Sequence, residues 1–143
     1  MKTLPLRMRQ QCQNALEIAT WLQSHPKISQ VQYAFLPDHP QFALMHRLSG
    51  GKGGGAVLSF EVRGAGKPEL FALMDALQLI QPATSLGDIY SLMLYPAISS
   101  HRSLTPEERH SLGIGDGLLR LSAGIEDAAD IQADLEQALA ILD

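Results

Sequence analysis

The chain has little cysteine and no long apolar run. Cys12 is the one cysteine among 143 residues, so neither an internal disulfide nor a cysteine-based metal cluster can form. No apolar run approaches the roughly 20 residues needed to cross a bilayer. The first residues include basic side chains but lack the apolar core of a secretory signal. We therefore expect a cytoplasmic protein.

An excess of positive charge is also missing. Eleven Lys and Arg stand against fifteen Asp and Glu, which gives a formal net charge of −4. No basic run is interleaved with aromatic residues, so the composition argues against nucleic acid as the partner. A hydrophobic fraction of 45% with 18% charged residues is typical of a folded globular chain. At this length we expect residues 1–143 to form a single domain with a real core.

Common catalytic patterns do not appear either. No Ser-His-Asp order, paired catalytic carboxylates or dinucleotide fingerprint rises above chance. The glycine-rich stretch Gly50–Gly55 lacks the phosphate-loop pattern and precedes a strand, so we interpret it as a connector. Cys12 fits a helix residue better than a nucleophile. The histidines show no metal-ligand spacing; they are His25, His39, His46, His101 and His110.

Hydrophobic spacing predicts an alternation of helices and short strands. Helices are expected over about 5–25, from Phe42 to about 49, from Lys67, after a capping box that begins at Thr105, and after Asp127. Strands are expected over about 29–33, 56–62, 91–95 and 118–122. This order predicts an α/β layer sandwich with a small sheet covered by helices. Acidic residues of the last helix, Asp134 among them, are expected on solvated faces.

Three motifs in the last third of the chain carry the most information. They read SLGDIYSL at 85–92, YPAISSH at 95–101 and GIGDGLLRLSAGIED at 113–127. In this order and spacing the chain resembles the C-terminal domain of the Cys/Met-metabolism family of pyridoxal-phosphate (PLP) enzymes. The family includes cystathionine γ-synthase, the cystathionine lyases, homoserine sulfhydrylases and methionine γ-lyase. The resemblance runs from about Leu4 to Leu142 and implies a mostly antiparallel sheet with helices on its outer side, as in fold-type I enzymes.

The same resemblance implies that a large cofactor-binding domain is missing. In the family that domain carries the lysine that binds PLP, and the resemblance implies that this chain begins at the family's domain junction. None of the four lysines lies in a context like the family's Ser-x-Thr-Lys-Tyr motif; they are Lys2, Lys27, Lys52 and Lys67. PLP is therefore expected in the full-length family and not on this chain.

Arg120 is the strongest candidate for a binding role. It lies between Leu119 and Leu121 in a predicted strand, where a guanidinium is costly unless it reaches solvent or an anion. Its planar fork suits a carboxylate. From the residues alone, a structural ion pair with Glu126 or Asp88 is the alternative. The resemblance implies that Arg120 holds the α-carboxylate of an amino-acid substrate.

Ser85 and Thr84 precede the first motif. The resemblance implies that Ser85 helps to position the substrate carboxylate, while a turn-capping hydroxyl is the alternative. Thr84 occupies a position where the family varies and which is associated with the choice of reaction. His101 is expected to fix the loop before Thr105 through local hydrogen bonds, and we name no catalytic residue.

The resulting hypothesis is the substrate-side part of a PLP-dependent lyase or synthase. The full-length relative would eliminate or replace a group at the β or γ carbon of a sulfur amino acid or homoserine ester, as in methionine biosynthesis. The isolated chain is expected to be inactive. The alternative is a stand-alone carboxylate-binding or oligomerisation module that associates through an exposed patch around Trp21 and Leu22. A PLP-binding large domain or a second copy would then be the protein partner.

Overall fold

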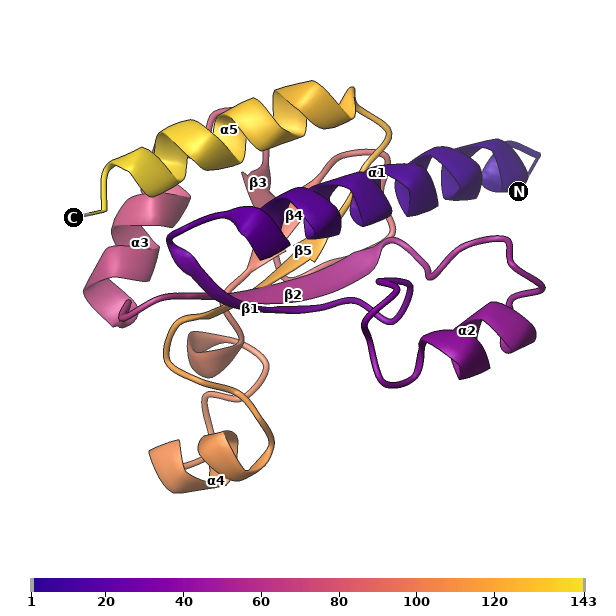
Figure 1. Ribbon diagram of the computed structural model, residues 1–143. Coiled ribbons are helices and arrows are strands. Elements are labelled where there is room, and N and C mark those ends of the chain that lie inside the picture. Colours follow the sequence, from indigo (N-terminus) through magenta and orange to yellow (C-terminus); the bar gives the residue numbers. More distant parts are fainter. Residues whose placement is uncertain (1, 143) are drawn as a thin grey trace.

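The computed structural model describes residues 2–142 as a small sheet covered by helices (Figure 1). The helices are α1 (Leu4–Ser24), α2 (Phe42–Leu48), α3 (Lys67–Ala76), α4 (Pro106–Ser111) and α5 (Ala128–Ala140). The strands are β1 (Ile28–Gln32), β2 (Val57–Val62), β3 (Gln81–Pro82), β4 (Leu92–Leu94) and β5 (Leu118–Ser122), and a short 3₁₀ helix, η1, spans Pro96–Ile98. The predicted α/β class and the predicted longer elements are confirmed.

The five strands form one sheet in the order β1-β2-β5-β4-β3. All neighbouring pairs are antiparallel except β3 and β4, which run parallel. The sheet is therefore mostly antiparallel, as the family resemblance implies. In the register of the central strands, Arg120 of β5 lies opposite Ser59 of β2 on one side and opposite Leu94 of β4 on the other.

One face of the sheet carries the core. Alternate residues of β2 point into it, so Leu58, Phe60 and Val62 are buried together with Leu119 and Leu121 of β5. Figure 1 shows α1 and α5 side by side over this face, whereas η1 and α4 hang from the opposite side. Each fully buried side chain of this size contributes about 1.5–3 kcal/mol to stability. Because the long helices α1 and α5 cover only one face, β5 presents its other residues to a more open surface.

The helix starts follow the predicted capping chemistry. The Thr105 hydroxyl accepts the Glu108 amide and the Glu108 carboxylate accepts the Thr105 amide, which completes a capping box for α4. The Asp127 side chain accepts the Ala129 amide at the start of α5. These contacts orient the two segments that flank β5.

Two expectations about surfaces are wrong. Leu22 is fully buried, and Trp21 is half-buried against the core with its ring centroid 5.3 Å from that of His25, so they form no exposed patch. Asp134 is also buried, because its carboxylate turns inward to the segment before β3. No helix within residues 2–142 combines the length and the apolar character that crossing a bilayer requires.

Candidate functional site

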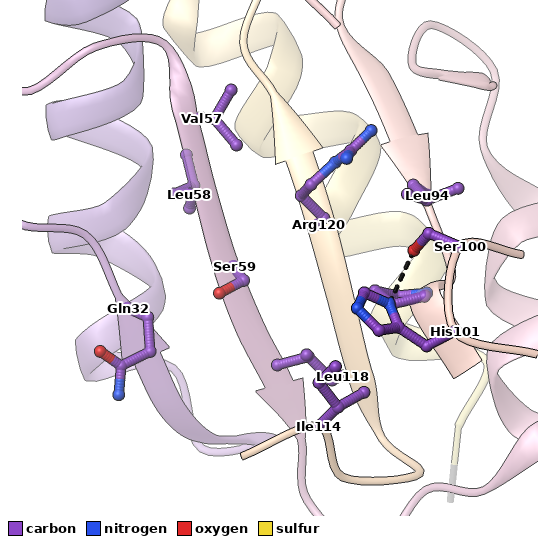
Figure 2. A pocket seen from close by; sticks show the side chains of 11 residues that line it. Gln32, Val57, Leu58, Ser59, Leu94, Ser100, His101, Ile114, Leu118 and Arg120 are labelled. Carbon is purple, nitrogen blue, oxygen red and sulfur yellow. Dashed lines mark hydrogen bonds between the residues drawn. The ribbon is translucent and has the colours of Figure 1, made fainter. Parts of the chain in front are cut away.

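Arg120 is the centre of the candidate site. Its strand neighbours Leu119 and Leu121 point into the core, which sends the Arg120 side chain to the opposite face of β5. There it lies half-buried beside Ser59 and Leu94 (Figure 2). The sheet register thus places a guanidinium on an otherwise weakly polar surface.

The guanidinium is held by one carbonyl group. Arg120 Nη2 donates to the carbonyl oxygen of Ser85 at 3.2 Å, and Arg120 Nε is buried with no hydrogen-bond partner. The ion pairs within residues 2–142 join His25 to Glu136 and Arg109 to Asp116, and Arg120 takes part in neither. Its positive charge is therefore available for an anion.

The structural ion pair considered from the sequence does not form. The Glu126 carboxylate accepts the Ser91 amide at 2.7 Å and the Ser91 hydroxyl at 3.0 Å. Asp88 is exposed, and its side chain accepts the adjacent Ile89 amide at 2.6 Å. Both carboxylates thus accept hydrogen bonds from nearby residues, and neither forms an ion pair with Arg120.

The structure brings Ser85 to Arg120 through its backbone. Ser85 and Thr84 are exposed in the segment between β3 and β4. The Ser85 carbonyl contacts the guanidinium, while its hydroxyl has no hydrogen bond among residues 2–142. No hydrogen bond within the same residues joins Thr84 to Arg120. The predicted proximity of Ser85 is therefore present, and the Ser85 hydroxyl remains available to a ligand.

A hollow of about 300 Å³ opens beside Arg120 on this face. Figure 2 shows its wall of side chains, with Ser100 and His101 at one end. Ser100 Oγ lies 2.8 Å from His101 Nδ1, and the His101 carbonyl accepts the Leu104 amide at 3.2 Å. The apolar part of the lining consists of Val57, Leu58, Leu94, Pro96, Ile114 and Leu118. The sequence analysis assigned no role to Ser59 or Ser100, because only the strand pairing and the turn after η1 bring them to the hollow beside Arg120.

None of the chain's lysines lines this hollow. Lys27 Nζ donates to the carbonyls of Leu139 and Leu142 at the end of α5. Lys67 Nζ lies 5.6 Å from the centroid of the Phe71 ring, and Lys52 borders a separate hollow with Arg9. Within residues 2–142, no three His, Cys, Asp or Glu side chains come close enough to hold a metal.

A comparison with known protein families identifies the family of this chain. The family described as "Cys/Met metabolism PLP-dependent enzyme" matches residues 1–140. The chain belongs to this family. The family depends on PLP, and no lysine within residues 2–142 lines the hollow beside Arg120 where a cofactor lysine would have to lie.

Family members with different named activities are similar to the chain. It is 42% identical over 142 residues to an O-succinylhomoserine sulfhydrylase of Pseudomonas aeruginosa, covering 99% of this chain and 34% of that enzyme. It is 45% identical over 139 residues to an L-methionine γ-lyase of Pseudomonas deceptionensis, covering 97% and 34%. A cystathionine β-lyase of Coxiella burnetii is 42% identical, with 97% and 35% covered. The chain thus spans about a third of the length of these relatives.

Solved structures of the family agree with the fold. A cystathionine γ-lyase of Lactobacillus plantarum, complexed with L-serine, superimposes with a TM-score of 0.87 at 39% identity, covering 98% of this chain and 36% of that one. A putative O-acetylhomoserine (thiol)-lyase of Campylobacter jejuni gives a TM-score of 0.89 at 35% identity, covering 96% and 32%. The five-stranded sheet and its helices are therefore a fold shared with PLP enzymes of this family.

Proposed function

We propose that this chain supplies the substrate-binding side of a PLP-dependent active site. Arg120 anchors the α-carboxylate of an amino-acid substrate, Ser85 assists it, and Thr84 borders the same position. The observation that carries the proposal is the Arg120 guanidinium, half-buried on the sheet face opposite to α1 and α5 without an ion-pair partner within residues 2–142. The proposal also takes residues 1–143 as a single C-terminal domain and assigns cofactor binding to a separate large domain.

The chemistry of the guanidinium supports a carboxylate ligand. Arginine presents its donors in a planar fork that matches the two oxygens of a carboxylate. The Ser85 carbonyl occupies one Nη2 donor and so limits rotation of the fork, which lowers the entropy lost on binding. The half-buried position reduces the screening of the charge by water. Hydrogen bonds to a charged group typically contribute about 1.5–3 kcal/mol.

The proposed reaction class is elimination or replacement at the β or γ carbon of a sulfur amino acid or homoserine ester. The relatives are named for O-succinylhomoserine, cystathionine and methionine. These compounds share the α-carboxylate and differ in the side chain, so one arginine can serve all of them. Since no lysine of this chain lines the hollow beside Arg120, we expect the isolated chain to release no keto acid. The metabolic activities of the relatives support a cytoplasmic setting.

Exposed apolar side chains near the site support a protein partner. Leu86 is 56% exposed and Tyr90 is 57% exposed, and both follow Ser85 in the same segment. We propose that the cofactor-bearing domain covers them. The alternative is a carboxylate-binding or self-associating module without catalysis, which the same exposed side chains favour. Sedimentation at rising concentration separates the two, because a module of the second kind forms oligomers by itself.

The direct test is an NMR titration of the chain with L-methionine and with L-methioninol, which lacks the carboxylate. We expect L-methionine to shift the Arg120 side-chain N–H signals and L-methioninol to leave them unchanged. Arg120→Gln should weaken L-methionine binding at least tenfold. Arg47→Gln, at an exposed position of α2, is the matched control and should bind as the unmodified chain does. Equal binding by Arg120→Gln would refute the assignment.

A further inference from the structure

The segment that carries Ser85 is bound to the rest of the chain through its backbone. All seven residues from Thr84 to Tyr90 are exposed, and no helix or strand spans them. We call residues 84–90 the carboxylate loop. An exposed segment of this kind is expected to be mobile unless other parts of the chain bind its backbone. Other parts of the chain do bind it: the Ile89 carbonyl accepts the Ile125 amide at 2.9 Å, and further bonds come from buried side chains.

Buried side chains from two elements bind the middle of the carboxylate loop. The Gly87 amide donates to Ser122 Oγ of β5 at 3.0 Å, and Gly87 adopts a positive φ of 79° that favours glycine. Gln11 Nε2 of α1 donates to the Asp88 carbonyl at 2.6 Å. Ser122 is 1% exposed and Gln11 is 2% exposed. The loop is thus tied both to the strand that carries Arg120 and to the first helix.

Glu126 closes the far end of the loop. Its Oε1 accepts the Ser91 amide at 2.7 Å, and its Oε2 accepts the Ser91 hydroxyl at 3.0 Å. Ser91 is fully buried, and its hydroxyl also accepts the Gly124 amide at 2.9 Å. Glu126 forms none of the ion pairs within residues 2–142, so its charge is stabilised by these donors. A partly buried carboxylate without a cation partner is costly unless hydrogen bonds satisfy its oxygens, and the Ser91 amide and hydroxyl do so here.

The backbone that follows β5 lies close against this end of the loop. Asn14 of α1 is fully buried, and its Nδ2 donates to the carbonyls of Gly124 at 3.0 Å and Glu126 at 2.7 Å. A Cβ at Gly124 would lie 2.2 Å from Glu126 Oε2 and 2.4 Å from the Ile89 carbonyl oxygen. The backbone after β5 therefore approaches the loop too closely for a residue with a Cβ at position 124, and the Glu126 carboxylate lies beside that position.

These contacts connect directly to Arg120. Ser122, which binds Gly87, follows Arg120 on the same face of β5. Ser85, at the start of the loop, binds Arg120 Nη2 through its carbonyl. The loop is consequently bound to the strand at both Ser85 and Gly87. Its other end is bound by the Ile125 amide, which donates to the Ile89 carbonyl, and by the Glu126 carboxylate at Ser91.

We infer that Glu126 is a positioning residue for the carboxylate site. Its carboxylate fixes the loop through Ser91 and so holds the Ser85 carbonyl against the Arg120 guanidinium. The expected effect of Glu126 on substrate binding rests on the proposed function of Arg120. The expected effect of Glu126 on the order of the loop does not. A residue outside the hollow thereby sets the direction in which the guanidinium presents its free N–H groups.

The test compares Glu126→Gln and Glu126→Ala with Leu139→Ala in the full chain. Leu139 is fully buried near the opposite end of α5, so its truncation lowers stability without touching the loop. Amide hydrogen exchange of Gly87 and Ser91 reports loop order without ligand, and NMR titration with L-methionine reports binding. Glu126→Gln keeps the shape and one acceptor, so it remains informative if Glu126→Ala does not fold.

We expect Glu126→Gln to increase exchange at Gly87 and Ser91 at least tenfold beyond Leu139→Ala and to weaken L-methionine binding about fivefold. Unchanged exchange in both Glu126 variants, or an equal increase in Leu139→Ala, overturns the inference. If the unmodified chain binds L-methionine no better than L-methioninol, the proposed function fails, and the exchange data still decide whether Glu126 orders the loop. Faster exchange with unchanged binding would overturn the positioning role.

Discussion

Asp134 offers a sharp test of how this fold holds the segment leading to the site. Its Oδ1 accepts the Gln78 amide at 2.8 Å, and its Oδ2 accepts the amides of Leu79 and Ile80 at 2.9 and 2.8 Å. Asp134→Asn turns one acceptor into a donor, so at least one amide loses its partner and the other bonds lose their charge. A lost bond to a charged group costs about 1.5–3 kcal/mol, and each weakened one costs about 1 kcal/mol.

We therefore expect Asp134→Asn to lower the free energy of unfolding by about 3.5–5 kcal/mol at pH 7. For a domain of this size, the midpoint temperature should fall by roughly 10–15 °C. Urea unfolding followed by circular dichroism measures the first quantity, and calorimetry measures the second. A loss below about 1 kcal/mol would refute the argument, since it would mean that water satisfies these amides equally well.

The same variant has a characteristic dependence on pH. Burial by itself raises the pKa of Asp134, but hydrogen bonds from the amides of Ile80, Gln78 and Leu79 and from Gln137 outweigh it and hold this pKa below its usual value. The stabilisation is therefore fully present above the unfolded pKa of about 3.9 and is lost as the pH falls through the folded value. The stability gap between the unmodified chain and Asp134→Asn should be constant from pH 7 to 5 and narrow below about pH 4. A gap that stays constant throughout this range would contradict the ionised carboxylate as its source.

Two further substitutions test the loop and a helix start. Gly124→Ala should cost about 1–3 kcal/mol and displace the carboxylate loop, because the new Cβ would lie 2.4 Å from the Ile89 carbonyl oxygen; unchanged stability in urea would contradict that contact. Thr105→Ala should cost about 1 kcal/mol by removing the acceptor for the Glu108 amide, while leaving L-methionine binding unchanged. Loss of binding in Thr105→Ala would mean that α4 takes part in the site.

Periodicity predicted the elements whose stabilising contacts repeat along the chain. Leu70 and Leu73 mark the buried stripe of α3, and the alternation of Leu58 and Phe60 marks the buried face of β2. These patterns are visible because a strand needs an apolar side chain on its buried face at every second residue, and a helix needs one at about every turn. Local capping at Thr105 was predictable for the same reason, since its partner lies within the same turn.

The remaining features depend on contacts between distant residues. β3 spans only Gln81–Pro82, too short for a period, and it runs parallel to β4 while Asp134 binds the amides just before it. In sequence Asp134 looks like the polar face of a helix, and only the docking of α5 buries it. From the sequence, Glu126 could equally have formed an ion pair with Arg120, and only the fold brings the Ser91 amide to its carboxylate instead. Strand order and long-range partners of this kind are absent from local patterns.

The most direct measurement for the central account is a visible absorption spectrum of the purified chain with added PLP, followed by borohydride reduction and peptide mass mapping. If the chain supplies only the carboxylate-binding side of the site, no saturable aldimine band should form and any label should scatter over surface lysines. A saturable band with one reduced adduct on a single lysine would show that the chain holds its own cofactor site, and it would contradict this account.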